Sequence, residues 1–185
     1  MSDDIREQAH APEVADGSMA DAGEARRGDD AEECKNLVVG VGASAGGLEV
    51  LQQFFNAMPR ISGCAFVVVQ HLSPDHRSML PEILGKQTKM PVIQARNEMK
   101  ILPNHVYLIP PRNNMVVHKG HLYLSEYDTS QVNHPIDIFF DSLAEEMGDR
   151  GVAVVLSGTG SDGTRGIKTV KEAGGLVRKG IVIDE

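Results

Sequence analysis

Cysteine, aromatic residues and long apolar runs are all scarce in this sequence. Its two cysteines, Cys34 and Cys64, are too few for a disulfide framework or a structural zinc site, so we expect ordinary thiols. With no Trp, three Tyr, five Phe and no basic stripe, the chain lacks the features of a nucleic-acid-binding surface. No segment approaches the roughly 18 consecutive apolar residues of a membrane span, and the first residues lack the apolar core of a secretory signal. We therefore expect a cytoplasmic protein that does not insert into a membrane.

Acidic charge is concentrated at the N-terminal end of the chain. Residues 1–36 hold 11 of the 26 acidic residues and 4 of the 18 basic ones, which leaves 15 acidic and 14 basic residues for 37–185. The first 36 residues also contain no aromatic side chain and no sustained apolar period, so they cannot bury enough surface to offset the entropy of ordering. We expect a disordered acidic tail over 1–36 and a single domain over 37–185.

Short valine-rich runs at 37–41 and 65–69 are typical of strands that are covered on both faces of a parallel sheet. The segment between them has helical spacing of its apolar residues, Leu48, Leu51, Phe54, Phe55 and Met58. Together these segments predict a β-α-β unit.

The rest of the chain continues this alternation. One helix is expected from a cap at Ser73, with Pro74 in its first turn, through the apolar residues up to Leu84. Further helices are expected over 136–147 with Gly148 as its stop, and around Ile167 and Val170. Strands are expected at 92–94, 106–109, 115–118, 121–125, 152–156 and near Leu176. The strands at 115–118 and 121–125 flank Lys119-Gly120, which favours a tight hairpin. The predicted fold is a doubly wound α/β sheet, mostly parallel, with helices on both faces and the antiparallel hairpin at one edge.

Three loops follow predicted strands, at 42–47 (GASAGG), 70–76 (QHLSPDH) and 157–163 (SGTGSDG). The carboxyl ends of parallel strands meet at one edge of a sheet, where ligands bind. The loops carry Ser44, His71 and Asp162, so we expect these three side chains to lie near one another.

The loop around Ser44 is compatible with three roles. It fits G-x-S-x-G, a strand-to-helix turn that exposes a serine oxygen, and it fits the dinucleotide fingerprint G-x-G-x-x-A through Gly40, Gly42 and Ala45. A serine that merely caps a helix is the third reading. A dinucleotide site wants an acidic residue at the end of the second strand, and this chain has Gln70-His71 there instead.

Each remaining residue also has an ordinary structural role to set against a catalytic one. A lone histidine such as His71 is more often bonded to backbone, and Asp162 is as well explained as the N-cap of the last helix. A nucleophilic serine, however, needs a histidine as base and a carboxylate to orient it. Three glycines around Asp162 (Gly158, Gly160 and Gly163) leave backbone amides open for an oxyanion. The coincidence of all three loops favours a Ser-His-Asp site. The other histidines match no zinc motif, although His118 and His121 face each other across the hairpin, and we expect no metal or cofactor.

At these residues the chain resembles the chemotaxis receptor methylesterases, the CheB-type protein-glutamate methylesterases. GASAGG is similar to that family's serine loop, QH to its histidine and SGTGSDG to its aspartate loop. The resemblance runs from about Leu37 to Gly175 and includes NHVYLIPPRNN (104–114) and PIDIFFDSLAEEMG (135–148). It implies an α/β domain that hydrolyses glutamate methyl esters on the cytoplasmic helices of chemoreceptors, and in many members also deamidates glutamine. Ser44 would be the nucleophile, His71 the base and Asp162 its orienting group, with the backbone of Ala45, Thr159 and Gly160 at the oxyanion or substrate loop.

The sequence departs from that family's pattern in three ways. Stand-alone members carry an N-terminal receiver domain, whereas only the acidic tail precedes this domain. The spellings SAGG and SGTGSDG are more similar to the module fused to a receptor methyltransferase, which makes such an enzyme a possible partner. After GGLV the family continues through a segment containing GMP, whereas this chain ends at RKGIVIDE, so we expect a domain over 37–185 that is incomplete at its C-terminus.

Two further functions stand beside the esterase. The missing C-terminal segment favours a truncated, non-catalytic remnant that binds receptors or a methyltransferase, while the filled Ser, His and Asp positions favour the enzyme. A nucleotide-binding module ranks third, because the acidic residue at the end of the second strand is absent.

Overall fold

The computed structural model describes residues 37–44, 46–70, 79–127, 130, 132–157 and 161–180. The expected acidic tail over 1–36 therefore lies outside the described residues. In chain order the elements are β1 (Val38–Ala43), α2 (Leu48–Ala57), β2 (Ala65–Gln70), α3 (Leu80–Leu84), β3 (Val92–Gln94), β4 (Met99–Lys100), β5 (Val106–Leu108), β6 (Asn113–His118), β7 (His121–Glu126), α4 (Pro135–Met147), the short 3₁₀ helix η1 (Gly148–Arg150), β8 (Gly151–Ser157), α5 (Thr164–Glu172) and β9 (Leu176–Lys179). None of the helices in these ranges is long and apolar enough to cross a membrane.

The main sheet has six strands in the order β3-β5-β2-β1-β8-β9, and every pair in it is parallel. The central strand β1 lies between β2, which follows it through α2, and β8, which arrives much later in the chain. The order of the strands therefore reverses beside β1, and such a reversal opens a crevice at the carboxyl edge of a sheet. The predicted mostly parallel α/β architecture is confirmed.

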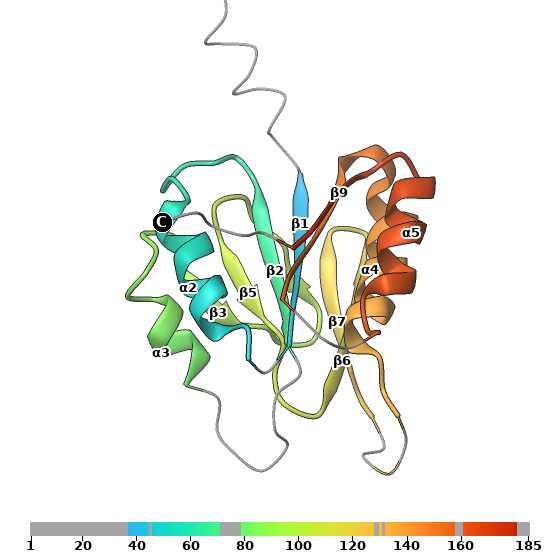
Figure 1. Cartoon of the computed structure of the whole chain (residues 1–185), viewed down its shortest axis with the longest axis horizontal. Helices are drawn as coiled ribbons and strands as arrows, with labels where there is room; N and C mark the ends of the chain where they lie inside the picture. The colour runs from blue at the N-terminus through green and yellow to red at the C-terminus, as the bar shows by residue number, and fades with distance from the viewer. Residues whose placement is uncertain are drawn as a thin grey trace, which may run out of the picture.

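Helices cover both faces of this sheet, as Figure 1 shows, with α2 and α3 on one side and α4 and α5 on the other. Alternation along each strand divides the core between the two faces. Val39 and Val41 of β1 pack in the apolar cluster beneath α2, here called the α2 core. Val67 and Val69 of β2 pack in the cluster beneath α4, here called the α4 core. Parallel strands that are buried on both faces have continuous apolar sequences, and for this reason the valine-rich segments correctly predicted β1 and β2.

Two glycines of β1 bring α4 unusually close to the sheet. A Cβ added at Gly40 would lie 2.8 Å from a ring carbon of Phe140, and one added at Gly42 would lie 2.7 Å from Ile136 Cγ2. Both distances are shorter than real side-chain contacts, so the α4 side chains occupy the space that a larger residue would need. The N-terminal turn of α4 is thereby held against the end of β1.

The hairpin of β6 and β7 does not lie at the edge of the main sheet. It pairs with β4 to form a separate three-stranded sheet in the order β4-β7-β6, so its predicted placement was wrong while its existence was right. Lys119 and Gly120 both have positive φ, as a tight two-residue hairpin turn requires. The buried side chains of this sheet join the α4 core (Met115, Val117 and Leu122). The apolar face of the hairpin packs against α4, and the sequence of the hairpin alone does not show which element covers that face.

Buried tyrosine Tyr107 of β5 links the main sheet to the chain that leads into β4. Its hydroxyl accepts a hydrogen bond from the Leu102 N–H at 2.8 Å and donates one to the Lys100 carbonyl at 3.2 Å. Burial raises the pKa of this hydroxyl, against the opposing effect of the bond from Leu102.

The remaining boundaries agree with the sequence. Gly148, with φ of 55°, follows the last residue of α4, and β8 and β9 cover the strands expected at 152–156 and near Leu176. Ser73 and Pro74 lie outside the described residues, and the helix α3 that the structure describes there begins at Leu80, with Met79 at its N-cap position.

We expect Gly40→Ala to lower the free energy of unfolding by about 1–3 kcal/mol, because the new methyl group must displace Phe139 and Phe140. Urea denaturation measures this change. Gly46→Ala is the matched control, since nothing lies within 4 Å of its Cβ position, and it should stay within about 0.5 kcal/mol of the parent. Equal losses in the two variants would contradict the close packing of α4 on β1.

Candidate active site

Ser44 lies directly after β1, in the turn that leads into α2. Its carbonyl accepts hydrogen bonds from the Gly47 N–H at 2.9 Å and from Gln70 Nε2 at 3.1 Å. Gln70 is 7% exposed, so a buried amide at the end of β2 ties down the backbone that carries the serine. The serine side chain is partly exposed, as a nucleophile must be. Ser44 is not among the described residues with positive φ, unlike the strained serine of α/β-hydrolase turns.

The strands that carry the three predicted loops end side by side. Ala43, the residue before Ser44, pairs with Gln70 on β2 and with Ser157 on β8. The pairing with β8 shifts between Gly42 and Ala43, so one residue of β8 bulges there. Bulges open the pairing of neighbouring strands and are frequent beside active sites. The chain therefore leaves β1, β2 and β8 at the same edge, as the sequence predicted.

Asp162 caps a helix, but not the helix that the sequence suggested. The alternative reading made Asp162 the N-cap of the following helix α5, whereas Gly163, with φ of 87°, occupies that position without a side-chain bond. The Asp162 carboxylate instead accepts the N–H of Ile136 at 3.1 Å and that of Asp137 at 2.9 Å. These amides begin α4, and a helix N-terminus stabilises negative charge. The side chain is 8% exposed, so the carboxylate is held in a largely dry position.

Asp137 makes the converse interaction, in which a side chain of α4 caps α5. Its side chain is buried, and its Oδ1 accepts the Gly166 N–H at 2.7 Å in the first turn of α5. The carboxylate before α5 thus caps α4, while a carboxylate within α4 caps α5. We call these three bonds the reciprocal cap; they join residues 136–137 to residues 162–166.

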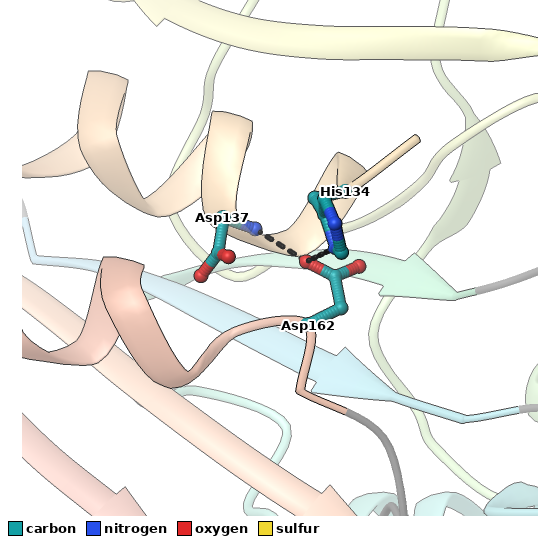
Figure 2. Close-up of side chains that lie close together, drawn as sticks. All are labelled: His134, Asp137 and Asp162. Atoms are coloured by element: carbon teal, nitrogen blue, oxygen red, sulfur yellow. Dashed lines mark hydrogen bonds and ion pairs between the residues drawn. The ribbon is translucent and has the colours of Figure 1, made fainter. Parts of the chain in front are cut away.

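His134 is the third side chain at this point (Figure 2). It precedes Pro135 at the start of α4, is 46% exposed, and places Nδ1 3.9 Å from Asp162 Oδ1. One ligand atom each of His134, Asp137 and Asp162 lies within 4.8 Å of the others, so the group has the composition of a metal site. Three backbone N–H groups already point at these carboxylates, however, and the positive ends of two helices disfavour a cation. The arrangement suits an ionised carboxylate better than a metal ion.

The glycines of the dinucleotide fingerprint serve the packing of α4 against β1 in this structure. Gly40 and Gly42 lie within β1 rather than in the loop, and the space at both is filled by α4. A phosphate-binding loop needs that space for its ligand. The packing therefore disfavours the nucleotide-binding reading.

Several predicted site residues lie outside the described residues. These are His71, Ala45, Thr159 and Gly160, together with Gly158. Their roles stay predictions.

Sequence reasoning missed His134, Asp137 and Gln70. Asp137 carried a signal, because it is an acidic residue within the apolar stripe of a helix, and Gln70 carried one as a polar residue ending a buried strand. Nothing local marks His134, whose position depends on where α4 begins.

The sequence model of the CheB methylesterase family matches residues 39–179. The chain belongs to the CheB methylesterase family. A protein-glutamate methylesterase/protein-glutamine glutaminase of Photorhabdus laumondii subsp. laumondii is 31% identical over 142 residues, which cover 74% of this chain and 40% of the relative. An uncharacterized 104.1 kDa protein in the hypE 3' region of Rhodobacter capsulatus is 47% identical over 97 residues, covering 52% of this chain and 10% of that protein.

The fold agrees with this assignment. The crystal structure of the Thermotoga maritima CheB methylesterase catalytic domain superposes with a TM-score of 0.67 at 29% identity, covering 76% of this chain and 77% of that domain. The chain spans well under half the length of the curated relatives that it matches.

We expect Asp162→Ala to lower the free energy of unfolding by about 0.5–2 kcal/mol, because the first-turn amides of α4 lose their acceptor. Urea denaturation followed by circular dichroism measures the loss. The neighbouring Ser161→Ala, at an exposed position, is the control and should change little. If Asp162→Ala is as stable as that control, the carboxylate does not cap α4.

Proposed function

We propose that this chain is a protein-glutamate methylesterase domain that works through Ser44, His71 and Asp162. The observation that carries the proposal is the shared carboxyl edge of β1, β2 and β8, where the three neighbouring strands end. Asp162, which follows β8, is bonded there to the start of α4. Membership of the CheB methylesterase family supports the reaction class. The match covers 40% of a relative named protein-glutamate methylesterase, and this name supports a protein-bound glutamate methyl ester as substrate.

Strand alternation supports the meeting of the three side chains. On β1, Gly40 and Gly42 face α4, and on β2, Val67 and Val69 face the same core. Because side chains alternate in steps of two, we propose that Ser44 and His71 lie on the α4 face, which is the face where Asp162 is bound. The alternation of the two strands and the position of the helix cap therefore both support a meeting of the three side chains on the α4 face.

The reaction divides into acylation and deacylation. Ser44 Oγ attacks the ester carbonyl carbon while the His71 imidazole takes the serine proton, and the imidazolium then gives that proton to the departing methoxide, which leaves as methanol. Water attacks the resulting acyl-enzyme with the imidazole again as base, and the glutamate carboxylate is released as Ser44 regains its proton. Asp162 orients the imidazole and stabilises its cation.

Backbone amides supply the remaining part of the proposed site. A tetrahedral intermediate carries an oxyanion, which preorganised N–H groups stabilise. We assign this task to the backbone at Ala45, Thr159 and Gly160, in the two loops that follow β1 and β8. The N-terminus of α2, which begins four residues after Ser44, adds its favourable dipole.

The substrate is proposed to be the methylated cytoplasmic helices of chemoreceptors, with the chain in the cytoplasm. A glutamine side chain differs from the methyl ester in its leaving group, ammonia in place of methanol, so deamidation uses the same groups. Relatives named both methylesterase and glutaminase support this second reaction. A receptor methyltransferase is a proposed partner of the domain.

We expect Ser44→Ala to abolish methanol release from a methylated receptor fragment while the unfolding midpoint stays near that of the parent, because a partly exposed hydroxyl contributes little to stability. Gas chromatography of released methanol measures the rate. Ser125→Ala, at an exposed position of β7, controls for the substitution itself. Parent-like turnover by Ser44→Ala would remove the catalytic assignment, and an inactive parent chain that still binds the fragment would favour the non-catalytic remnant.

A further inference from the structure

Asp137 is a buried acid on the core-facing side of α4. It is 6% exposed and lies between Ile136 and the Phe139–Phe140 pair, all of which belong to the apolar core. Burying a carboxylate is costly unless hydrogen bonds compensate for the lost hydration. Neither acylation nor deacylation, as proposed above, makes direct use of this residue.

The compensating bond is short and well enclosed. Asp137 Oδ1 accepts the Gly166 N–H at 2.7 Å, and this bond is buried. Gly166 lacks a Cβ, and a Cβ placed there would lie 2.5 Å from Phe140 Cβ. Only glycine at this position lets the first turn of α5 approach α4 closely enough for the bond.

The backbone of the same residue holds the proposed catalytic carboxylate. The Asp137 N–H donates to Asp162 Oδ1 at 2.9 Å, as Figure 2 shows. The side chain of Asp137 thus fixes the start of α5, and its main chain fixes the aspartate just before α5. A shift of α5 against α4 would move Asp162 relative to the amides that orient it.

We propose that Asp137 is a positioning residue for the esterase, which sets the direction of the Asp162 carboxylate through the reciprocal cap. This inference rests on the function proposed above. It does not require the negative charge of Asp137, because an amide oxygen at the same place accepts the Gly166 N–H as well.

A second tie between the same helices provides the matched control. Asp141, one turn further along α4, accepts hydrogen bonds from Arg165 at 2.7 Å and from Thr169 at 2.8 Å, both on α5. Among the described residues, no bond joins Asp141 to Asp162. Loss of Asp141 therefore removes one tie between α4 and α5 but leaves the reciprocal cap intact, so the start of α5 keeps its position beside Asp162.

The test compares Asp137→Ala, Asp137→Asn and Asp141→Ala in the full chain, by kcat and KM for methanol release and by unfolding midpoint. Asp137→Ala should lower kcat by about 10²-fold with little change in KM, since misplacement of a catalytic group affects the chemical step. Asp137→Asn should recover about tenfold or more of that loss, because it restores the acceptor. Asp141→Ala should lower the midpoint but keep the parent kcat.

Other outcomes would overturn the proposal. If Asp137→Asn loses as much kcat as Asp137→Ala, the charge and not the position of Asp137 matters; if Asp141→Ala loses as much, only general stability is at stake. If Asp137→Ala does not fold, Asp137→Glu takes its place, since its longer side chain keeps the charge but displaces Gly166 and should lose kcat where Asp137→Asn keeps it. Ser44→Ala separates the two claims: full activity in that variant refutes the proposed function, whereas its inactivity beside parent-like Asp137 variants refutes only the positioning role.

Discussion

The hydrogen bonds between the Asp162 carboxylate and the first amides of α4 are the interaction on which the proposed site depends. A side chain that follows β8 is thereby fixed to the first turn of a helix that precedes β8, so two segments distant in sequence are joined in one unit. The amides of a helix N-terminus also stabilise negative charge, which keeps the carboxylate suited to orienting an imidazole. Structure and proposed chemistry draw on the same bonds.

This unit reaches the carboxyl edge of the sheet because β1 allows it. Gly40 and Gly42 leave room for Phe140 and Ile136, so that α4 lies tightly against the central strand and begins next to its end. The buried amide of Gln70 holds the Ser44 backbone from the other neighbouring strand. The glycine-rich stretch that invites a nucleotide-binding interpretation thus serves helix packing on one side and a serine turn on the other.

Local patterns predicted most of the fold, since strands buried on both faces and amphipathic helices carry their own signal, as at β1, β2 and α4. The predicted convergence of three loop-bearing strands was also correct, because it follows from parallel topology. The two-residue strand β4 and the separate small sheet were missed, since a short strand has no period and its partner lies in another part of the chain. The alternative reading of Asp162 as a cap named the wrong helix, because sequence spacing reveals only capping by sequence neighbours, and Gly163 is the N-cap of α5. Asp137 was marked only as an acidic residue on an apolar helix face, and the contact of Asp137 and His134 with Asp162 depends on tertiary packing.

The most direct measurement is a crystal structure of the full chain that resolves residues 71–78 and 158–160. Our account predicts one ring nitrogen of His71 within about 2.6–3.2 Å of Ser44 Oγ and the other bonded to the Asp162 carboxylate, while Asp162 keeps its bonds to α4. An imidazole of His71 that lies on the α2 face of the sheet, with Asp162 contacting only His134 and the α4 amides, would contradict it.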